Sequence, residues 1–269
     1  MSSISEYLAG DALYGDDFSL EEIEQWFKDE EEGYANLGAG DKSNYSYQYH
    51  ELNKRHAFRR LAGRVFPNAL GLGSAYCDEL EPIAGQISKI TVLEPSSAFD
   101  STKNVLQIPC EYIKPNSSGI MPFEDETFDL ISCLGVLHHI PNVSFVLSEC
   151  HRCLAKGGTM ILREPIVSMG DWRNQRPGLT THERGIPIGL FNNMISRAGL
   201  EVEHSAYCVF PIVPKLFGKL SKQPVYNNAF ATKIDSILSS MFSWNQVYHR
   251  TKTLQKLAPA SVFFVLRKK

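Results

Sequence analysis

Residues 69–77 read ALGLGSAYC, and residues 91–95 read TVLEP. Each segment contains a short apolar run typical of a buried strand, and the first run leads into a glycine-containing turn. Similar runs alternate with helical segments along most of the chain. The strands expected are 69–72, 90–93, 112–113, 128–133, 159–162, 202–209 and 261–266. This alternation predicts βαβ units and therefore an α/β fold with a doubly wound, mostly parallel sheet.

Helix signals lie on both sides of these runs. Ser19 and Glu22 form a capping-box pattern, which predicts a helix that begins there and ends near residue 33. A second helix is expected between 142 and 157, where asparagine and glycine mark the ends, and a third at about 187–198. These helices are placed to cover the faces of the sheet.

Two segments interrupt the alternation. Residues 211–259 carry a helical pattern and an aromatic cluster, and we interpret them as a helical insertion before the last strand. Residues 1–62 contain a basic stretch at 54–60, which fits either a cap helix with a solvated basic face or a lid over a polar ligand. We therefore expect an N-terminal helical cap or lid over 1–62 and a main domain over 63–269.

Composition limits the possible classes of protein. The chain has 269 residues, is 43% hydrophobic and has a formal net charge of −3. This much apolar material predicts a folded core, and without a basic excess we expect no nucleic-acid partner. We find neither a signal-peptide pattern nor an apolar run as long as a membrane span, so a cytoplasmic protein is expected.

The six cysteines are sparse, as is typical of a reducing compartment. Cys150 and Cys153 could begin a zinc site, but a zinc site usually needs a second ligand cluster, and none is evident. Both cysteines instead fall at helical spacing with Val143, Val146 and Leu147, which predicts a buried stripe. We expect no metal ligands.

The glycine turn has two interpretations. A dinucleotide-binding fingerprint would use Gly71 and Gly73, but its third glycine position is occupied by Tyr76, whose side chain would block the pyrophosphate. An NAD site is therefore disfavoured. Glu94 follows the second strand about twenty residues after the turn, the separation at which a carboxylate accepts both hydroxyls of a ribose.

Two further stretches carry a family resemblance. Residues 121–140, MPFEDETFDLISCLGVLHHI, resemble the fourth-strand motif of class I S-adenosylmethionine-dependent methyltransferases. Residues 149–159, ECHRCLAKGGT, resemble that family's signature between a helix and the fifth strand. With the glycine turn and Glu94, the resemblance covers about residues 66–210. It implies a Rossmann-like fold with a seven-stranded sheet, S-adenosylmethionine as cofactor and S-adenosylhomocysteine as product.

The resemblance also implies which residues contact the cofactor. The turn should approach the methionine and ribose, the carboxylate should bind the ribose hydroxyls, and the residues after the second and third strands should meet the adenine. The residues concerned, including two at the end of the fourth strand, are Gly71, Gly73, Ala75, Glu94, Pro95, Ser96, Asn116, Ser117, Leu134 and Gly135.

The turn departs from the family pattern at three positions. Gly71 stands where the family usually has an acid, and Ala75 and Cys77 replace glycines. Alanine does not easily adopt a positive φ, so the turn could be looser than in the family. Lid residues are therefore expected to supply further contacts to the cofactor, namely Tyr47, Tyr49, His50 and Arg59.

Methyl transfer to a hydroxyl gains from a general base. The candidates are His139, after the fourth strand, and His182 and Glu183, in a long polar loop. His138 is less favoured because neighbours on a turn usually point apart, and His139 could equally be a structural histidine.

The acceptor cannot be identified from the sequence. Aromatic residues mixed with polar ones in both cap segments favour a sugar-like or natural-product small molecule and O-methylation. The alternative is a non-catalytic cofactor-binding or scaffold protein with a degenerate glycine turn. Oligomeric state is not predicted.

Overall fold

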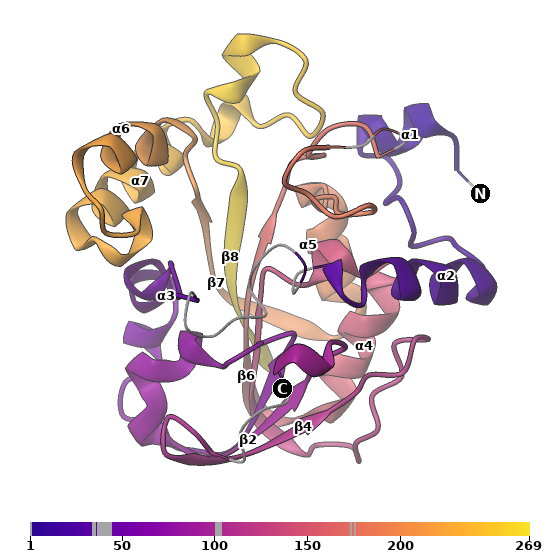
Figure 1. Ribbon diagram of the computed structural model, residues 1–269, viewed down its shortest axis with the longest axis vertical. Helices are drawn as coiled ribbons and strands as arrows, with labels where there is room; N and C mark the ends of the chain where they lie inside the picture. The colour runs from indigo at the N-terminus through magenta and orange to yellow at the C-terminus, as the bar shows by residue number, and fades with distance from the viewer. Residues whose placement is uncertain (1, 34–35, 37–44, 100–103, 173, 175) are drawn as a thin grey trace.

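The computed structural model describes residues 2–33, 36, 45–99, 104–172, 174 and 176–269. An eight-stranded sheet runs through the centre in the order β3-β4-β2-β1-β5-β6-β8-β7 (Figure 1). The strands are β1 (Phe66–Leu72), β2 (Ile87–Leu93), β3 (Asn104–Val105), β4 (Ile108–Ile113), β5 (Phe128–Leu134), β6 (Leu154–Pro165), β7 (Leu200–Cys208) and β8 (Ser261–Lys268).

Strand direction agrees with the mostly parallel sheet expected from the sequence. β4, β2, β1, β5 and β6 are parallel neighbours, while β8 runs antiparallel to both β6 and β7. All seven expected strands are present, and the eighth is the two-residue β3, which pairs antiparallel with β4. Sequence patterns did not predict β3 because two residues carry no detectable periodicity.

Helices cover both faces of the sheet, which confirms the doubly wound arrangement (Figure 1). On one face, α4 (Val143–Cys153) and α5 (Ile188–Arg197) pack in a core with Ile131 and Phe264. On the other, α3 (His50–His56), η2 (Phe58–Arg60) and η3 (Asp78–Gln86) pack in a core with Ile90 and Phe263.

The cysteine stripe on α4 is buried as predicted. Cys150 and Cys153 have no exposed surface and pack in the core beside Val143 and Leu147. The helix ends at Cys153 rather than near Gly157, because β6 already begins at Leu154.

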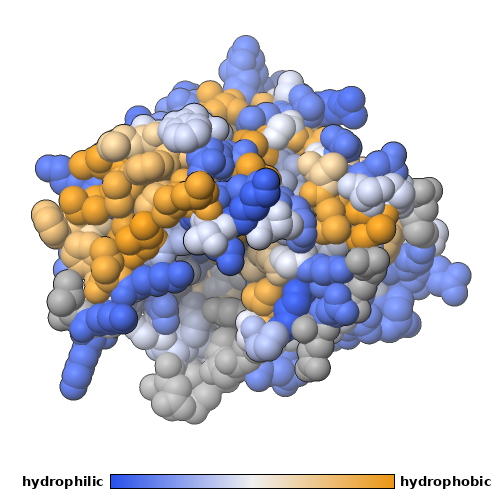
Figure 2. All heavy atoms as spheres, turned by 90° about the horizontal axis from the view of Figure 1, so that it is seen from above, coloured by the Kyte–Doolittle hydropathy of each residue, from blue (hydrophilic) through white to orange (hydrophobic). Residues whose placement is uncertain are grey.

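Several helical elements connect β7 to β8. They are α6 (Ile212–Leu220), η6 (Val225–Asn227), α7 (Ala229–Met241), η7 (Ser243–Asn245) and η8 (Thr253–Lys256). Buried Asp235 on α7 accepts the backbone N–H groups of Val209 and Phe210, which fixes this segment to the end of β7. In Figure 2, apolar side chains gather on the side of the molecule that carries α6 and α7, where Leu216 and Phe230 are exposed. No helix in the described part of the chain combines the length and hydropathy of a membrane span.

The N-terminal segment crosses the carboxyl edge of the sheet. It contains α1 (Ile4–Ala9) and α2 (Leu20–Glu30), and α2 starts with the predicted capping box of Ser19 and Glu22. Trp26 is 1% exposed, and its indole N–H donates to the His139 carbonyl over 2.7 Å. His182 stacks on the indole with ring centroids 4.5 Å apart. These contacts hold α2 beside the turn that follows β5.

Candidate functional site

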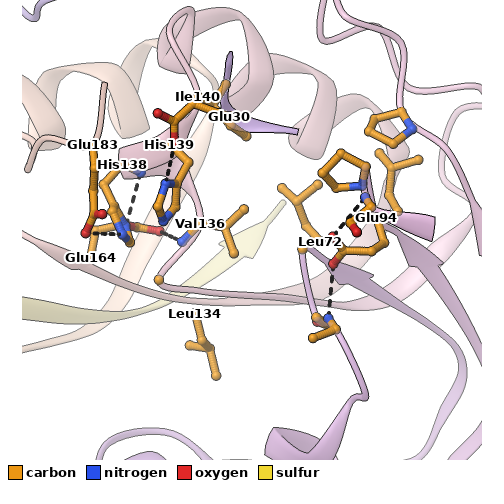
Figure 3. A pocket seen from close by; sticks show the side chains of 18 of the residues that line it. Glu30, Leu72, Glu94, Leu134, Val136, His138, His139, Ile140, Glu164 and Glu183 are labelled. Carbon is orange, nitrogen blue, oxygen red and sulfur yellow. Dashed lines mark hydrogen bonds and ion pairs between the residues drawn. The ribbon is translucent and has the colours of Figure 1, made fainter. Parts of the chain in front are cut away.

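A cavity of about 670 Å³ opens at the carboxyl ends of β1, β2, β5 and β6. This is the edge where ligands bind in open α/β sheets, at the point where strand order reverses on either side of β1. Its volume falls within the range of small-molecule sites. Residues from α2 and the segment 45–49 line it from the N-terminal side. Figure 3 shows two polar groups at separate parts of the cavity, with Leu134 and Val136 between them.

The glycine turn keeps a left-handed backbone at alternate positions despite its sequence. Gly73, Ala75 and Cys77 have φ values of 58°, 43° and 58°. Non-glycine residues rarely adopt such values, and the expectation that Ala75 would loosen the turn is therefore wrong. The Gly73 N–H donates to the Leu93 carbonyl over 2.9 Å, which ties the turn to the end of β2.

Glu94 lies directly after β2 and forms the first polar group. Its carboxylate accepts the Ala75 N–H over 3.1 Å and the Ser96 N–H over 3.4 Å. Burial raises the pKa of Glu94 to about 7 despite these two hydrogen bonds. The oxygens retain further acceptor capacity toward the cavity, as binding two hydroxyl groups would require.

The second group is built around the turn Leu137–His139 (η5). Glu164 at the end of β6 is fully buried and accepts the N–H groups of Val136 and Leu137 over 2.8 Å each. It also bonds Nδ1 of His138 over 2.7 Å, while Nε2 of His138 lies 3.5 Å from a Glu183 oxygen. One carboxylate thus fixes the backbone of the turn and the orientation of the first histidine.

The protonation state of His138 follows from these partners. Burial disfavours its charged form, but Glu164 and Glu183 outweigh burial and raise the pKa of His138 to about 9. Burial likewise acts against ionised Glu183, yet the His138 bond and charge lower the pKa of Glu183 to about 2. His138 is therefore a buried imidazolium between two carboxylates at neutral pH.

His139 has the opposite character. Burial and the neighbouring His138 charge, with ring centroids 4.1 Å apart, lower its pKa, although Glu30 opposes the shift. Nδ1 of His139 lies 3.0 Å from a Glu30 oxygen and 3.2 Å from the Thr180 hydroxyl. The pKa of Glu30 is lowered because its hydrogen bonds outweigh burial. A neutral ring that donates Nδ1–H to ionised Glu30 leaves Nε2 as its basic nitrogen.

Most residues expected from the sequence do lie around this cavity. The residues in its lining are Tyr47, Tyr49, Gly73, Ala75, Glu94, Pro95, Ser96, Asn116, Ser117, Leu134, Gly135, His139 and Glu183. The cavity lies at the edge of the sheet expected from the glycine turn and Glu94.

Four expected residues lie outside the lining. Gly71 is buried within β1 below the turn. His50 faces Glu81, with 3.4 Å between Nε2 and the carboxylate, and Arg59 is exposed on η2. His182 bonds Asp29 on α2 over 2.8 Å, so it fastens α2 instead of facing the cavity. The basic stretch thus lies on α3 and η2, on one face of the sheet and outside the cavity lining.

The insertion lies outside the cavity lining. No described residue between 211 and 259 lines the cavity, whereas Tyr45, Tyr47 and Tyr49 of the N-terminal segment do. Trp172 and Tyr248 pack together in a separate buried cluster.

Sequence reasoning missed five charged residues of the lining, namely Glu30, Glu31, Glu79, Arg163 and Glu164. Each lies in a stretch that reads as ordinary helix or strand, so only the tertiary structure places them in the cavity. It also undervalued His138, whose ring bonds Glu164 and lies beside the ring of His139, with centroids 4.1 Å apart.

The ligand atoms of His138, His139 and Glu183 lie within 4.8 Å of one another, a spacing that a cation could use. The proton that His138 holds between its two carboxylates would compete with such a cation.

Comparison with known proteins agrees with this geometry. Residues 70–162 match the model of the methyltransferase domain family. A probable S-adenosylmethionine-dependent methyltransferase from Mycolicibacterium smegmatis is 24% identical over 163 residues, covering 60% of this chain and 62% of that protein. The chain thus spans less than two thirds of this relative's length.

Two solved structures share the fold. The [4+2]-cyclase SpnF has a TM-score of 0.55 at 13% identity and covers 93% of this chain and 97% of its own. The N-methyltransferase NodS from Bradyrhizobium japonicum WM9, in complex with S-adenosylhomocysteine, has a TM-score of 0.51 at 12% identity, covering 87% and 97%. Residues 70–162, which include the motifs at 121–140 and 149–159 and nearly all of the motif at 69–77, thus form a region that matches the methyltransferase domain family.

Proposed function

We propose that this protein transfers a methyl group from S-adenosylmethionine to a hydroxyl of a small, sugar-like or natural-product acceptor, with His139 as the general base. The observation that carries this proposal is the neutral imidazole of His139 in the same cavity as Glu94. The cofactor supplies an electrophilic methyl on a positively charged sulfur, so the leaving group is neutral.

The residues present fit the cofactor at the Glu94 end of the cavity. A buried carboxylate with spare acceptor capacity suits the two ribose hydroxyls. The left-handed turn at 73–77 brings backbone close to the neighbouring part of the ligand, and Asn116 and Ser117 offer polar groups farther along. The retained shape of the turn favours a binding-competent protein over a degenerate scaffold.

His139 suits the role of base better than the other two candidates. Nε2 of His139 makes no hydrogen bond within the described part of the chain, and Glu30 orients the ring from the other side. Glu183 is committed to His138 and Thr180, with a pKa of about 2 that makes it a weak base. His182 lies outside the lining. The proposed proton path is from the acceptor hydroxyl to Nε2 of His139.

The acceptor class rests on the lining at 45–49. Tyr45, Tyr47 and Tyr49 offer ring faces on which a sugar ring can stack, while Gln48 and Glu31 offer polar partners for hydroxyls. A concave site of this size favours a small molecule over a macromolecular surface.

The test measures transfer of labelled methyl groups from S-adenosylmethionine to a panel of polyhydroxylated small molecules. For the acceptor that is methylated, His139→Gln should lower kcat by about 10²–10⁴-fold with affinity for S-adenosylhomocysteine within about twofold. His151→Gln on α4, away from the cavity, is the matched control and should retain activity. Full turnover by His139→Gln would remove the general base, and transfer only to nitrogen acceptors would overturn the proposed O-methylation.

A further inference from the structure

Arg163 has no carboxylate partner among the residues that the structure describes. Arg163 lies two residues before the end of β6. It is 7% exposed and lines the cavity. Its Nη1 is buried without a hydrogen bond, and among the described residues no carboxylate lies within ion-pair distance. Its neighbour Glu164 points to the opposite face, since side chains alternate along a strand, and is occupied by His138.

Arg184 is a second buried arginine, and its hydrogen bonds are those of a structural residue. Arg184 is fully buried and donates to the carbonyls of Tyr14, Leu137, Ile140 and Pro141. Its guanidinium is therefore satisfied by the backbone. Arg163 differs from Arg184 in this respect, and a buried cation without a partner strongly destabilises a fold.

The guanidinium of Arg163 is held in one orientation by an aromatic stack. It lies 3.8 Å over the ring of Tyr49, which is itself stacked on Tyr226 with centroids 5.5 Å apart. Gly135, at a φ of 84°, lies beside the guanidinium, because a Cβ built there would be 3.7 Å from Nη2, an ordinary contact distance. The stack on Tyr49 thus fixes the orientation of the cation, and Nη1 is left without a hydrogen-bond partner.

We propose that Arg163 binds an anionic group, a carboxylate or phosphate, of a ligand in this cavity. The planar guanidinium matches both groups through paired hydrogen bonds. The inference rests on the proposed function, because it assigns the cavity's ligands to the methyl-transfer reaction.

Position favours the acceptor as the source of the anion. Glu94 marks the ribose end at β2, and in the sheet order β6 lies three strands away, about 14 Å at the usual spacing. Arg163 is also adjacent in sequence to Glu164, which holds the His138 and His139 turn. The alternative source is the carboxylate of the cofactor's methionine moiety.

Calorimetric titration of the full chain separates these sources. S-adenosylhomocysteine is compared with 5′-methylthioadenosine, which lacks the amino-acid carboxylate. Protein saturated with S-adenosylhomocysteine is then titrated with glucuronate against glucose, with benzoate against benzyl alcohol, and with inorganic phosphate. The variants are Arg163→Met, Arg163→Lys and, as control, Arg267→Met, an exposed arginine on β8. Only variants that unfold cooperatively are compared.

The expected result is that wild-type protein prefers at least one acid over its neutral counterpart, or binds phosphate. Arg163→Met should lower that affinity at least tenfold, Arg163→Lys should retain part of it, and S-adenosylhomocysteine binding should change by less than about twofold. A loss for S-adenosylhomocysteine but not for 5′-methylthioadenosine would assign the anion to the cofactor. No change in any titration, or an equal loss for every ligand, would overturn the anion site. Failure of wild-type protein to bind S-adenosylhomocysteine would instead contradict the proposed function, and the anion titrations would still test Arg163 by themselves.

Discussion

His138 and His139 are neighbours in the chain, yet their surroundings give them opposite protonation states. His138 is held between Glu164 and Glu183, which stabilise the imidazolium, whereas His139 faces that positive charge and is buried. Only the neutral histidine can accept a proton at neutral pH. The two histidines therefore differ in function: His138 is a fixed positive charge and His139 is the candidate base.

The two histidines should therefore titrate separately. We expect the ring resonance of His138 to titrate near pH 9 and that of His139 below its ordinary value of 6.5, as measured by NMR on wild-type protein and on the single variants for assignment. Glu30→Gln should lower the pKa of His139 further, because it removes a negative charge that favours the imidazolium. Titration of both rings near pH 6.5 would show that the network does not form.

The glycine turn keeps a left-handed backbone although two of its positions, Ala75 and Cys77, are not glycine. Ala75 and Cys77 hold the left-handed backbone that glycine would adopt without strain. The turn is stabilised by its hydrogen bond to Leu93 and by packing of Tyr76 against Phe99. Its conformation is set by tertiary contacts more than by local preference.

Substituting glycine in this turn should be tolerated. Ala75→Gly relieves a left-handed alanine, at a cost of about 1–2 kcal/mol in the parent, but it loses one buried methyl group, worth about 0.8 kcal/mol. We expect no loss of unfolding free energy, or a gain of up to about 1 kcal/mol, by chemical denaturation. The control is Ala69→Gly within β1, which should destabilise the protein. Equal losses in the two variants would contradict the strained turn.

Helix α2 depends on Trp26 for its position beside the site. Trp26→Phe would leave the His139 carbonyl without its donor, so we expect a loss of about 1–3 kcal/mol in unfolding free energy. Trp244 is 78% exposed, and Trp244→Phe should change stability by less than about 0.5 kcal/mol. A Trp26→Phe protein as stable as the Trp244 variant would mean that α2 is not anchored through this bond.

Sequence periodicity located the elements well because burial imposes it. All seven expected strands and the helix at 188–197 agree with the structure. Glu94 was found because it directly follows a strand, and His139 because it lies in the turn after one. Arg163 and Glu164 were not found, since the residues of β6 on both faces are buried and the strand reads as uniformly structural. The contacts of His50 and His182 are made with partners distant in sequence, which no local pattern encodes.

For the whole molecule, the His138 network links stability to pH. The pKa of His138 rises from 6.5 in the unfolded chain to about 9 in the fold. Its contribution to the unfolding free energy is therefore complete below pH 6.5 and is lost as the pH approaches 9. We expect unfolding free energy to fall over this range by at most about 3–4 kcal/mol, at about 1.4 kcal/mol per pKa unit. Burial raises the pKa of Glu79 and Glu94 to about 7, so the unfolding free energy also falls as the pH rises from 4.5 to 7.

Denaturation at pH 6.5, 7.5 and 9 measures this dependence. His138→Asn should be less stable than wild-type protein at pH 6.5 and should show a shallower decline, since the titrating ring is gone. An unfolding free energy that rises between pH 6.5 and 9 in wild-type protein would contradict the charged state of His138.

Across the whole molecule, the central claim is that the cavity at the carboxyl edge binds S-adenosylmethionine through Glu94. The most direct measurement is calorimetric titration of S-adenosylhomocysteine into wild-type protein, Glu94→Gln and Glu111→Gln, the last an exposed glutamate on neighbouring β4. Loss of a charged hydrogen-bond acceptor is worth about 1.5–3 kcal/mol, so we predict one-to-one binding that weakens about 10–100-fold in Glu94→Gln and is unchanged in Glu111→Gln. No binding to wild-type protein, or equal affinity in wild-type and Glu94→Gln proteins, would contradict the account.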